Sequence, residues 1–325
     1  MVDVYNIWFN MAVLKRRDIV KLVFNVESGL HVGKGGRGES LLEVLKVNGK
    51  PVIPESTWRG LFRSLAERLV QASLTSMKPG IEKDVLELHL KHFNTESTHL
   101  KGEDAKSEET LKKILGEVVS KHPTETDKFL QETIFTDENE MKSFIEIAGG
   151  SFKLKVNEDI RKFDILVSLA CPLCRLFGAL GLRSKLVFED TVVEEYQTHM
   201  KTCTSIDRSS RVASDKALFT QELIYPGRVK EEIIVLNVGP GSTEALILAL
   251  VLEYILNFGI LVGGRKSTGL GYLTVDEKES VVYVNDFTSV EDSRELVELL
   301  AKHDLSERYR KSLREYISYL RGESK

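Results

Sequence analysis

The stretch from residue 29 to residue 69 constrains the fold more than any other part of this 325-residue chain. It opens with a glycine-rich loop, and glycines adopt backbone angles that other residues resist, so a ligand can approach the main chain closely. Asn48-Gly49 then gives a strong hairpin signal between two largely apolar runs. Ser56 or Thr57 is placed to cap a helix that follows. The stretch therefore predicts a glycine loop, a strand pair and a helix within one structural unit.

Two glycine loops carry paired cations, GKGGRG at 33–38 and GGRKSTGLG at 263–271. Neither is a nucleotide-hydrolysing P-loop, because the G-x-x-x-x-G-K-[ST] pattern is absent. The glycines alone are also compatible with simple turns. Backbone amides beside cations nevertheless suit a row of phosphates. The candidate phosphate-binding cations are Lys34 and Arg37 in the first loop and Arg265 and Lys266 in the second.

Arg59 and Arg63 lie one turn apart near the start of the predicted helix. Guanidinium groups beside a helix N-terminus suit an extended polyanion. The same spacing also allows surface ion pairs with Glu55 and Glu67, and such pairs are common. Both interpretations remain open from the residues alone.

The net charge of −4 at first argues against a nucleic-acid partner, but the charge is unevenly distributed. Residues 76–165 hold 14 Lys and Arg against 19 Asp and Glu, whereas the windows 30–68 and 199–230 hold seven against four and six against three. Local concentration of cations matters more for phosphate binding than the total. Two basic regions therefore remain candidates for contact with a polyanion.

Compartment and membrane contact follow from simple features. Three cysteines in a chain of this length do not make a disulfide framework, which favours the reducing cytoplasm. The longest apolar run, at 245–264, is interrupted by Glu253 and Asn257, so it predicts a buried helix rather than a membrane span. We expect a cytoplasmic protein without membrane contact.

The order of predicted elements indicates a single α+β domain. A strand at 19–26, the hairpin and helix described above, two short strands at 185–196, a strand at 232–238, a helix capped by Ser242 and later strands approximate a ferredoxin-like (RRM-like) βαββαβ core. Residues 75–160 are acidic and helix-forming and predict a helical insertion. The core would then consist of residues 1–74 and 161–325 within one domain, 1–325.

Cys171-x-x-Cys174 can supply half of a tetrahedral zinc site. Two completions compete, His89-x-x-His92 and His199-x-x-x-Cys203. The alternative is a pair of small buried thiols without a metal. His31, in the sequence GLHVG, is interpreted as a packed or hydrogen-bonded histidine rather than a general base.

Four motifs occur in an order that points to a known family. They are GLHVG with the first glycine loop and PVIPESTWRGLFR, then CPLCRLFG at 171–178, IDR at 206–208, and GILVGGRKSTGLG at 259–271. In this order they resemble the RAMP superfamily of CRISPR proteins, and most closely the backbone subunits of type III RNA-guided effector complexes. The resemblance does not extend over residues 75–160. Four ordered motifs are specific, whereas any one of them would be weak.

This resemblance implies antiviral defence through sequence-independent binding of CRISPR guide RNA in a ribonucleoprotein. The partners would be guide RNA, target RNA, other CRISPR effector subunits and further copies of the chain along the RNA. The polar segment at 200–228 would form a projecting β-hairpin, or thumb, that carries Arg208 and Arg211 to the RNA. A residue at its tip, such as Leu218 or Phe219, would displace a base.

The resemblance also bears on catalysis. Subunits of this family that cut target RNA have an aspartate in the first glycine loop, and here Gly36 stands in its place, with Glu39 three residues on. Metal-dependent cleavage needs such a carboxylate, so magnesium is expected only if the chain is a nuclease after all. The alternatives kept open are a target-RNA endonuclease using Glu39, a guide-precursor ribonuclease with His31 as its base, and a structural subunit that bridges other proteins.

Overall fold

The computed structural model describes residues 14–34, 41–92, 99–100, 105–121, 157–206, 209, 213–290, 292–301 and 309–323. Strand β1 (Arg17–Val26) lies in the middle of its largest sheet. Val20, Leu22 and Phe24 alternate along β1 and point into the core. On one side, β1 pairs along its length with β9 (Arg228–Leu236). On the other side, it pairs with β12 (Val281–Tyr283) and β11 (Tyr272–Val275).

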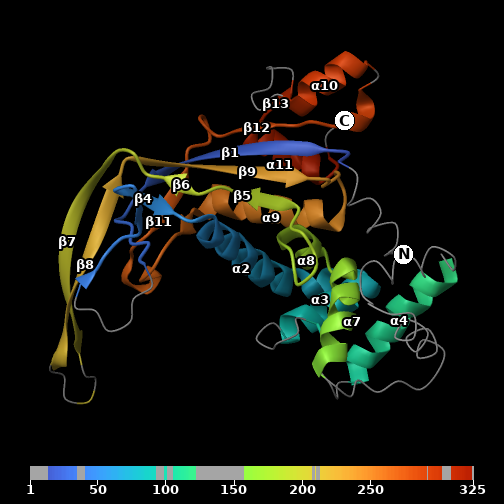
Figure 1. Ribbon diagram of the computed structural model, residues 1–325, viewed down its shortest axis with the longest axis horizontal. Coiled ribbons are helices and arrows are strands. Elements are labelled where there is room, and N and C mark those ends of the chain that lie inside the picture. The colour runs from blue at the N-terminus through green and yellow to red at the C-terminus, as the bar shows by residue number, and fades with distance from the viewer. Residues whose placement is uncertain are drawn as a thin grey trace.

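The remaining strands of this sheet extend it at both edges. Strand β5 (Leu186–Phe188) pairs with β9, β10 (Ile260–Leu261) with β11, and β13 (Arg310–Ser312) with β12. All of these pairings are antiparallel. The strand order across the middle of the sheet is therefore β5–β9–β1–β11, in a mixed α+β architecture with a curled antiparallel sheet (Figure 1).

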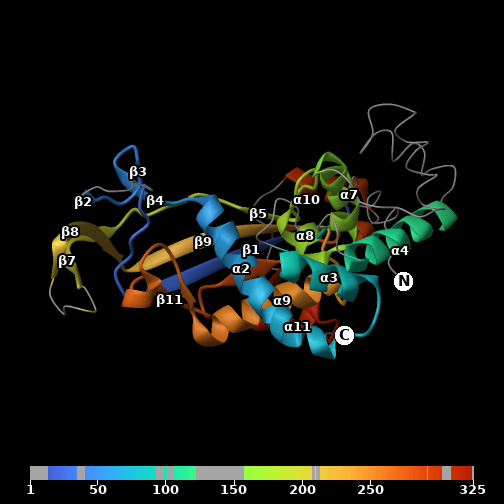
Figure 2. The same cartoon turned by 90° about the horizontal axis from the view of Figure 1, so that it is seen from below.

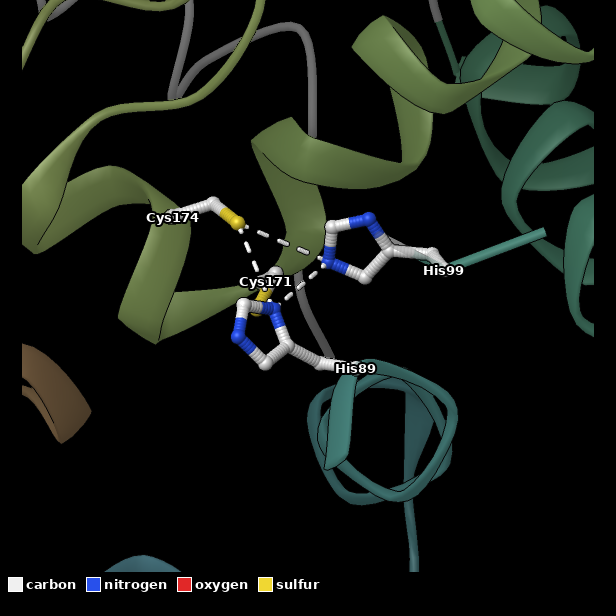
Figure 3. A group of neighbouring side chains, drawn as sticks. All are labelled: His89, His99, Cys171 and Cys174. Carbon is white, nitrogen blue, oxygen red and sulfur yellow. Dashed lines mark hydrogen bonds between the residues drawn. The ribbon is translucent and has the colours of Figure 1, made fainter. Parts of the chain in front are cut away.

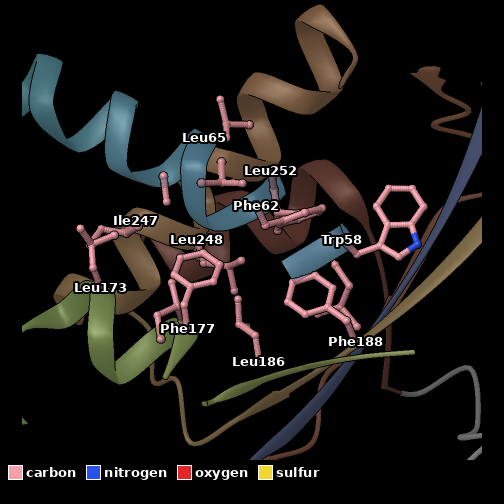
Figure 4. Packing of buried hydrophobic residues seen from close by; sticks show 14 of the residues in the cluster. Trp58, Phe62, Leu65, Leu173, Phe177, Leu186, Phe188, Ile247, Leu248 and Leu252 are labelled. Carbon is pink, nitrogen blue, oxygen red and sulfur yellow. The ribbon is translucent and has the colours of Figure 1, made fainter. Parts of the chain in front are cut away.

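Helices α2 (Glu55–Ser73) and α9 (Thr243–Phe258) cover one face of this sheet (Figure 2). The core between them is aromatic and aliphatic (Figure 4): Trp58 stacks on Phe24, and Phe62 packs edge-on against Phe188. Ser242 caps α9 through a hydrogen bond from the amide of Ala245, which confirms the predicted cap. Helix α11 (Leu313–Leu320) packs against α9 and completes this layer.

A long hairpin projects from the body of the protein (Figure 1). It consists of β7 (Tyr196–Ile206) and β8 (Ala213–Pro226), and β2 (Leu41–Leu42) runs parallel to β8. Leu218 and Phe219 lie within β8, paired with Thr204 and Cys203. The prediction that either residue forms the tip of the hairpin is therefore wrong, because the strand register places the turn between Ile206 and Ala213.

The predicted Asn48-Gly49 turn joins β3 (Lys46–Val47) to β4 (Lys50–Ile53), and both of its residues have positive φ. This is the geometry that a two-residue hairpin turn requires, so the local prediction is confirmed. Strand β4 pairs in turn with β6 (Thr191–Val192). These short strands place the start of α2 beside the large sheet.

A group of helices packs at the other end of the molecule from the hairpin (Figure 1). Its members are α3 (Ile81–His92), α4 (Ala105–Lys121), α7 (Asn157–Ala170) and α8 (Pro172–Phe177). Pro172 begins α8, where its missing amide hydrogen costs nothing. A short helix, α10 (Ser293–Ala301), lies near the C-terminus. Among the described residues, none of the helices has the length and apolar character needed to cross a bilayer.

Candidate nucleic-acid interface and metal centre

The two glycine loops, which are far apart in the sequence, meet in space. The amide of Gly264 donates to the carbonyl of His31 over 2.8 Å, and the amide of Gly271 donates to the carbonyl of Gly29 over 3.0 Å. Gly263 has φ of +84°, and a Cβ at this position would lie 2.4 Å from the carbonyl oxygen of His31. Only glycine fits there, so the contact between the loops depends on it.

A surface cavity of about 470 Å³ lies where the loops meet, and we call it the glycine-loop groove. Residues 31–34, residues 263–266 and Thr57 of α2 line it, together with Leu42 and Glu43. Three of the cations predicted from the sequence are therefore brought together: Lys34, Arg265 and Lys266.

The charges in the groove are not all free. The Lys34 ammonium lies 2.7 Å from the Glu43 carboxylate, and this hydrogen bond lowers the pKa of Glu43. The guanidinium of Arg265 lies 4.2 Å from the ring centre of Phe219, a cation–π contact that joins the groove to β8 of the hairpin. Burial, together with the nearby charge of Arg68, lowers the pKa of Lys266. Arg68 thus adds a cation beside the groove.

A second site lies in the helical group, where His89, His99, Cys171 and Cys174 converge (Figure 3). All four side chains are buried, and their ligand atoms lie within 4.8 Å of one another. Nδ1 of His89 lies 3.3 Å from Nε2 of His99, and the nitrogen–sulfur distances are 3.5 Å, 3.6 Å and 3.7 Å. Tetrahedral zinc, with bonds of about 2.0–2.1 Å to nitrogen and 2.3 Å to sulfur, separates two nitrogens by about 3.3 Å and a nitrogen from a sulfur by about 3.5 Å. The donor set therefore fits zinc.

Carboxylates orient both imidazoles of this cluster. Glu67 on α2 contacts Nε2 of His89 at 3.2 Å, and Asp164 on α7 contacts Nδ1 of His99 at 2.8 Å. The opposite ring nitrogens are thereby turned toward the sulfurs, as in the carboxylate–histidine pairs that support protein-bound metals.

Burial alone would raise the pKa of the Cys171 thiol, but the hydrogen bond from Cys174 and the two imidazoles hold this pKa well below its ordinary value. A thiolate suited to metal binding results.

A comparison with models of protein families shows to which family the chain belongs. The model of the RAMP superfamily matches residues 23–274, more than half of the chain. The chain belongs to the RAMP superfamily. A search of curated proteins finds no match to this sequence. The region matched to the RAMP model runs from β1 into β11 and so includes the glycine-loop groove, the hairpin and the metal centre.

The predicted RNA-binding residues of this RAMP protein fall into three groups. Lys34, Arg265 and Lys266 line the groove. Arg59 pairs with Glu55 at 2.7 Å, and Arg63 contacts Glu67 at 3.0 Å and the carbonyl of Gly178 at 3.1 Å. Neither arginine is among the residues that line the groove. Positions 37, 208 and 211, with Gly36 and Glu39 of the first loop, lie outside the described residues.

Arg68 was not singled out from the sequence, because a lone exposed arginine on a helix carries no signal of its own.

The metal-ligand predictions have mixed outcomes in this RAMP protein. Cys171, Cys174 and His89 belong to the cluster, as one of the two predicted completions requires. His92 does not belong to it, and His99 takes the fourth position. The completion by His199 and Cys203 is wrong, because both residues lie on β7 of the hairpin. His99 could not be identified from the usual spacing of zinc ligands, since it follows His89 by ten residues and lies outside α3.

Proposed function

We propose that this RAMP protein binds CRISPR guide RNA through the sugar–phosphate backbone, as a repeating subunit of a type III RNA-guided ribonucleoprotein. The observation that carries the proposal is the meeting of two cationic glycine loops at one groove. Backbone amides and cations recognise phosphates without regard to base identity, so reading of the target is left to base pairing with the guide.

The strand order supports a ferredoxin-like core for this function. Helix α2 connects β1 to the region of β5, and α9 connects β9 to the region of β11, with the order β5–β9–β1–β11. This order is the one expected of an antiparallel βαββαβ unit. The two glycine loops follow β1 and precede β11, which are neighbouring strands. A ferredoxin-like core would therefore place both loops on the same end of its sheet.

The projecting hairpin supports a thumb at 200–228 that reaches along the RNA. Strands β7 and β8 extend away from the body, and Phe219 of β8 lies under the Arg265 guanidinium of the groove. The hairpin is thus joined at this point to the phosphate-binding loops. Arg208 and Arg211, which lie outside the described residues, are proposed to contact RNA as well.

The metal centre supports a structural rather than a catalytic role for zinc. His89, His99, Cys171 and Cys174 would supply all four ligands of a tetrahedral zinc ion, so no position would remain for a water molecule or a substrate. The ligands come from α3, from the segment at 99–100 and from residues 171–174 at the start of α8. Bound zinc would fasten α3 and the segment at 99–100 to the start of α8.

Binding of labelled single-stranded guide RNA, measured by fluorescence anisotropy over a series of salt concentrations, tests the proposal. Arg265→Ala should weaken binding and reduce the slope of log K against log salt by about 0.7, the contribution of one phosphate on a single strand. Glu43→Gln should act in the opposite direction, because it releases Lys34 and removes a negative charge from the groove. Lys278→Ala, an exposed cation elsewhere, serves as the control. Binding that does not depend on salt would contradict the proposal.

A further inference from the structure

His31 is fixed in a single orientation at the glycine-loop groove. Its ring nitrogen Nδ1 lies 2.8 Å from the carbonyl oxygen of Glu222, and its own carbonyl accepts the amide of Gly264. The side chain of Glu222 is held in turn by the amide of Val44 and the ammonium of Lys46. A carbonyl oxygen only accepts hydrogen bonds, so Nδ1 carries the proton. In the neutral imidazole, Nε2 is therefore an acceptor.

The other ring nitrogen, Nε2, lies beside Gly33 and belongs to a residue that is only 7% exposed but lines the groove. His31 lines the groove, and among the described residues Nε2 makes no hydrogen bond. A Cβ on residue 33 would lie 2.9 Å from this nitrogen, so glycine at that position leaves the approach to it open. Gly264, on the opposite loop, adds no side chain either: a Cβ there would lie 3.6 Å from the imidazole. The structure thus presents an oriented acceptor among cations.

The chemistry of the nucleic-acid backbone selects what this acceptor can bind. Phosphate oxygens and the bridging and ring oxygens of the sugar are all acceptors, so they pair with the amides and cations of the groove but not with an unprotonated nitrogen. The ribose 2′-hydroxyl is the only donor on the backbone, and it distinguishes RNA from DNA. Of the other acceptors in the groove, the Glu43 carboxylate is paired with Lys34, whereas the Thr57 hydroxyl can donate as well as accept.

We propose that His31 accepts a hydrogen bond from a ribose 2′-hydroxyl and so makes the glycine-loop groove selective for RNA over other polyanions of the same charge. This inference rests on the proposed function, because it assumes that the sugar–phosphate backbone occupies the groove. It assigns to His31 a role in specificity that requires no proton transfer and no metal. The cations provide affinity for the backbone, and the imidazole provides selectivity for ribose.

The test compares two single strands of identical sequence, unmodified RNA and RNA with fluorine at every 2′ position. Fluorine keeps an RNA-like sugar but cannot donate, so the comparison measures the hydrogen bonds that 2′-hydroxyls donate to the protein. The wild-type protein should bind the unmodified strand about three- to tenfold more tightly, the range for one net hydrogen bond. Equal affinity of the wild-type protein for the two strands would overturn the inference.

Two variants remove the acceptor in different ways. Gly33→Ala keeps both ring nitrogens but places a Cβ 2.9 Å from Nε2, closer than a carbon can lie without a shift of the ring or the loop, and so blocks this nitrogen, whereas His31→Phe removes both nitrogens while keeping a ring. Each should bring the ratio of affinities close to one without weakening binding of the fluorinated strand. Arg265→Ala should weaken binding of both strands equally and preserve the ratio. A preference that survives Gly33→Ala and His31→Phe contradicts the role of His31, whereas failure of the wild-type protein to bind either strand contradicts the proposed function itself.

Discussion

Trp58, Thr191 and Glu231 form a buried chain of hydrogen bonds between α2 and the sheet. The indole of Trp58 donates to the hydroxyl of Thr191 over 2.9 Å, and this hydroxyl donates to the carboxyl group of Glu231 over 2.5 Å. Burial raises the pKa of Glu231 to about 8. The carboxyl group is therefore largely protonated at neutral pH, which avoids most of the cost of a buried charge.

The raised pKa of Glu231 predicts how stability depends on pH. The folded protein keeps this proton up to about pH 8, whereas the unfolded chain releases it above an ordinary pKa of 4.5. The stabilising contribution is thus complete below pH 4.5 and is lost as the pH rises through 8. Glu231→Gln, which cannot ionise, should remove this part of the fall in the free energy of unfolding as the pH rises. Urea unfolding of both proteins at pH 6 and pH 9 measures it, and parallel losses of free energy of unfolding would contradict the assignment.

At the scale of elements, α2 connects the two sites. Thr57, in its first turn, lines the glycine-loop groove. Further along the helix, Glu67 supports the imidazole of His89, and the next residue, Arg68, lies near Lys266. Arg63 holds Glu67 in position at 3.0 Å. One helix therefore contacts both the proposed RNA-binding loops and the metal centre.

Loss of a metal ligand should weaken the packing of α3 and the segment at 99–100 against the start of α8. We expect one zinc per chain by mass spectrometry of the metal, and loss of that zinc in His99→Ala. Because the binding energy of a structural metal is folding energy, the thermal midpoint should fall by more than about 5 °C. Cys203→Ser, at a cysteine on the hairpin, should retain both the zinc and the wild-type midpoint. Stoichiometric zinc in His99→Ala would refute the ligand set.

Elements set by local residues could be predicted from the sequence. The Asn48-Gly49 turn and the Ser242 cap each follow from a few neighbouring residues. The predicted cap of α2 by Ser56 or Thr57 is wrong, because the helix begins at Glu55 with Pro54 at its N-cap and no side chain caps it. The ligand His99 and the position of Leu218 within β8 depend instead on long-range packing and on strand register. Neither has a local signature, which explains why the histidine was missed and why the tip of the hairpin was misplaced.

At the scale of the whole molecule, the proposed RNA contacts lie away from the helices that carry the candidate metal ligands. The hairpin projects from one end and the helical group lies at the other, with the large sheet between them (Figure 1). Phe219 brings the hairpin against Arg265, so the groove and the hairpin are joined on one side of the protein.

A repeating subunit makes a prediction about stoichiometry. On guide RNAs of increasing length, the number of copies bound should rise in steps, because each subunit occupies a fixed length of backbone. Native mass spectrometry counts the copies directly. Arg265→Ala should reduce the occupancy at a given concentration without changing the size of the step. A single bound copy on every length of RNA would contradict the repeating arrangement.

The direct pairing of β1 with β11 has a consequence for how such a protein can diversify. Val26 lies opposite Leu273 in the sheet, only a few residues from the loops that meet at Gly29 and Gly271. The spacing between these loops is therefore set by a few neighbouring residues, whatever the length of polypeptide between the two strands. Evolution can enlarge, shorten or replace the intervening helices while the surface offered to a polymer keeps its dimensions.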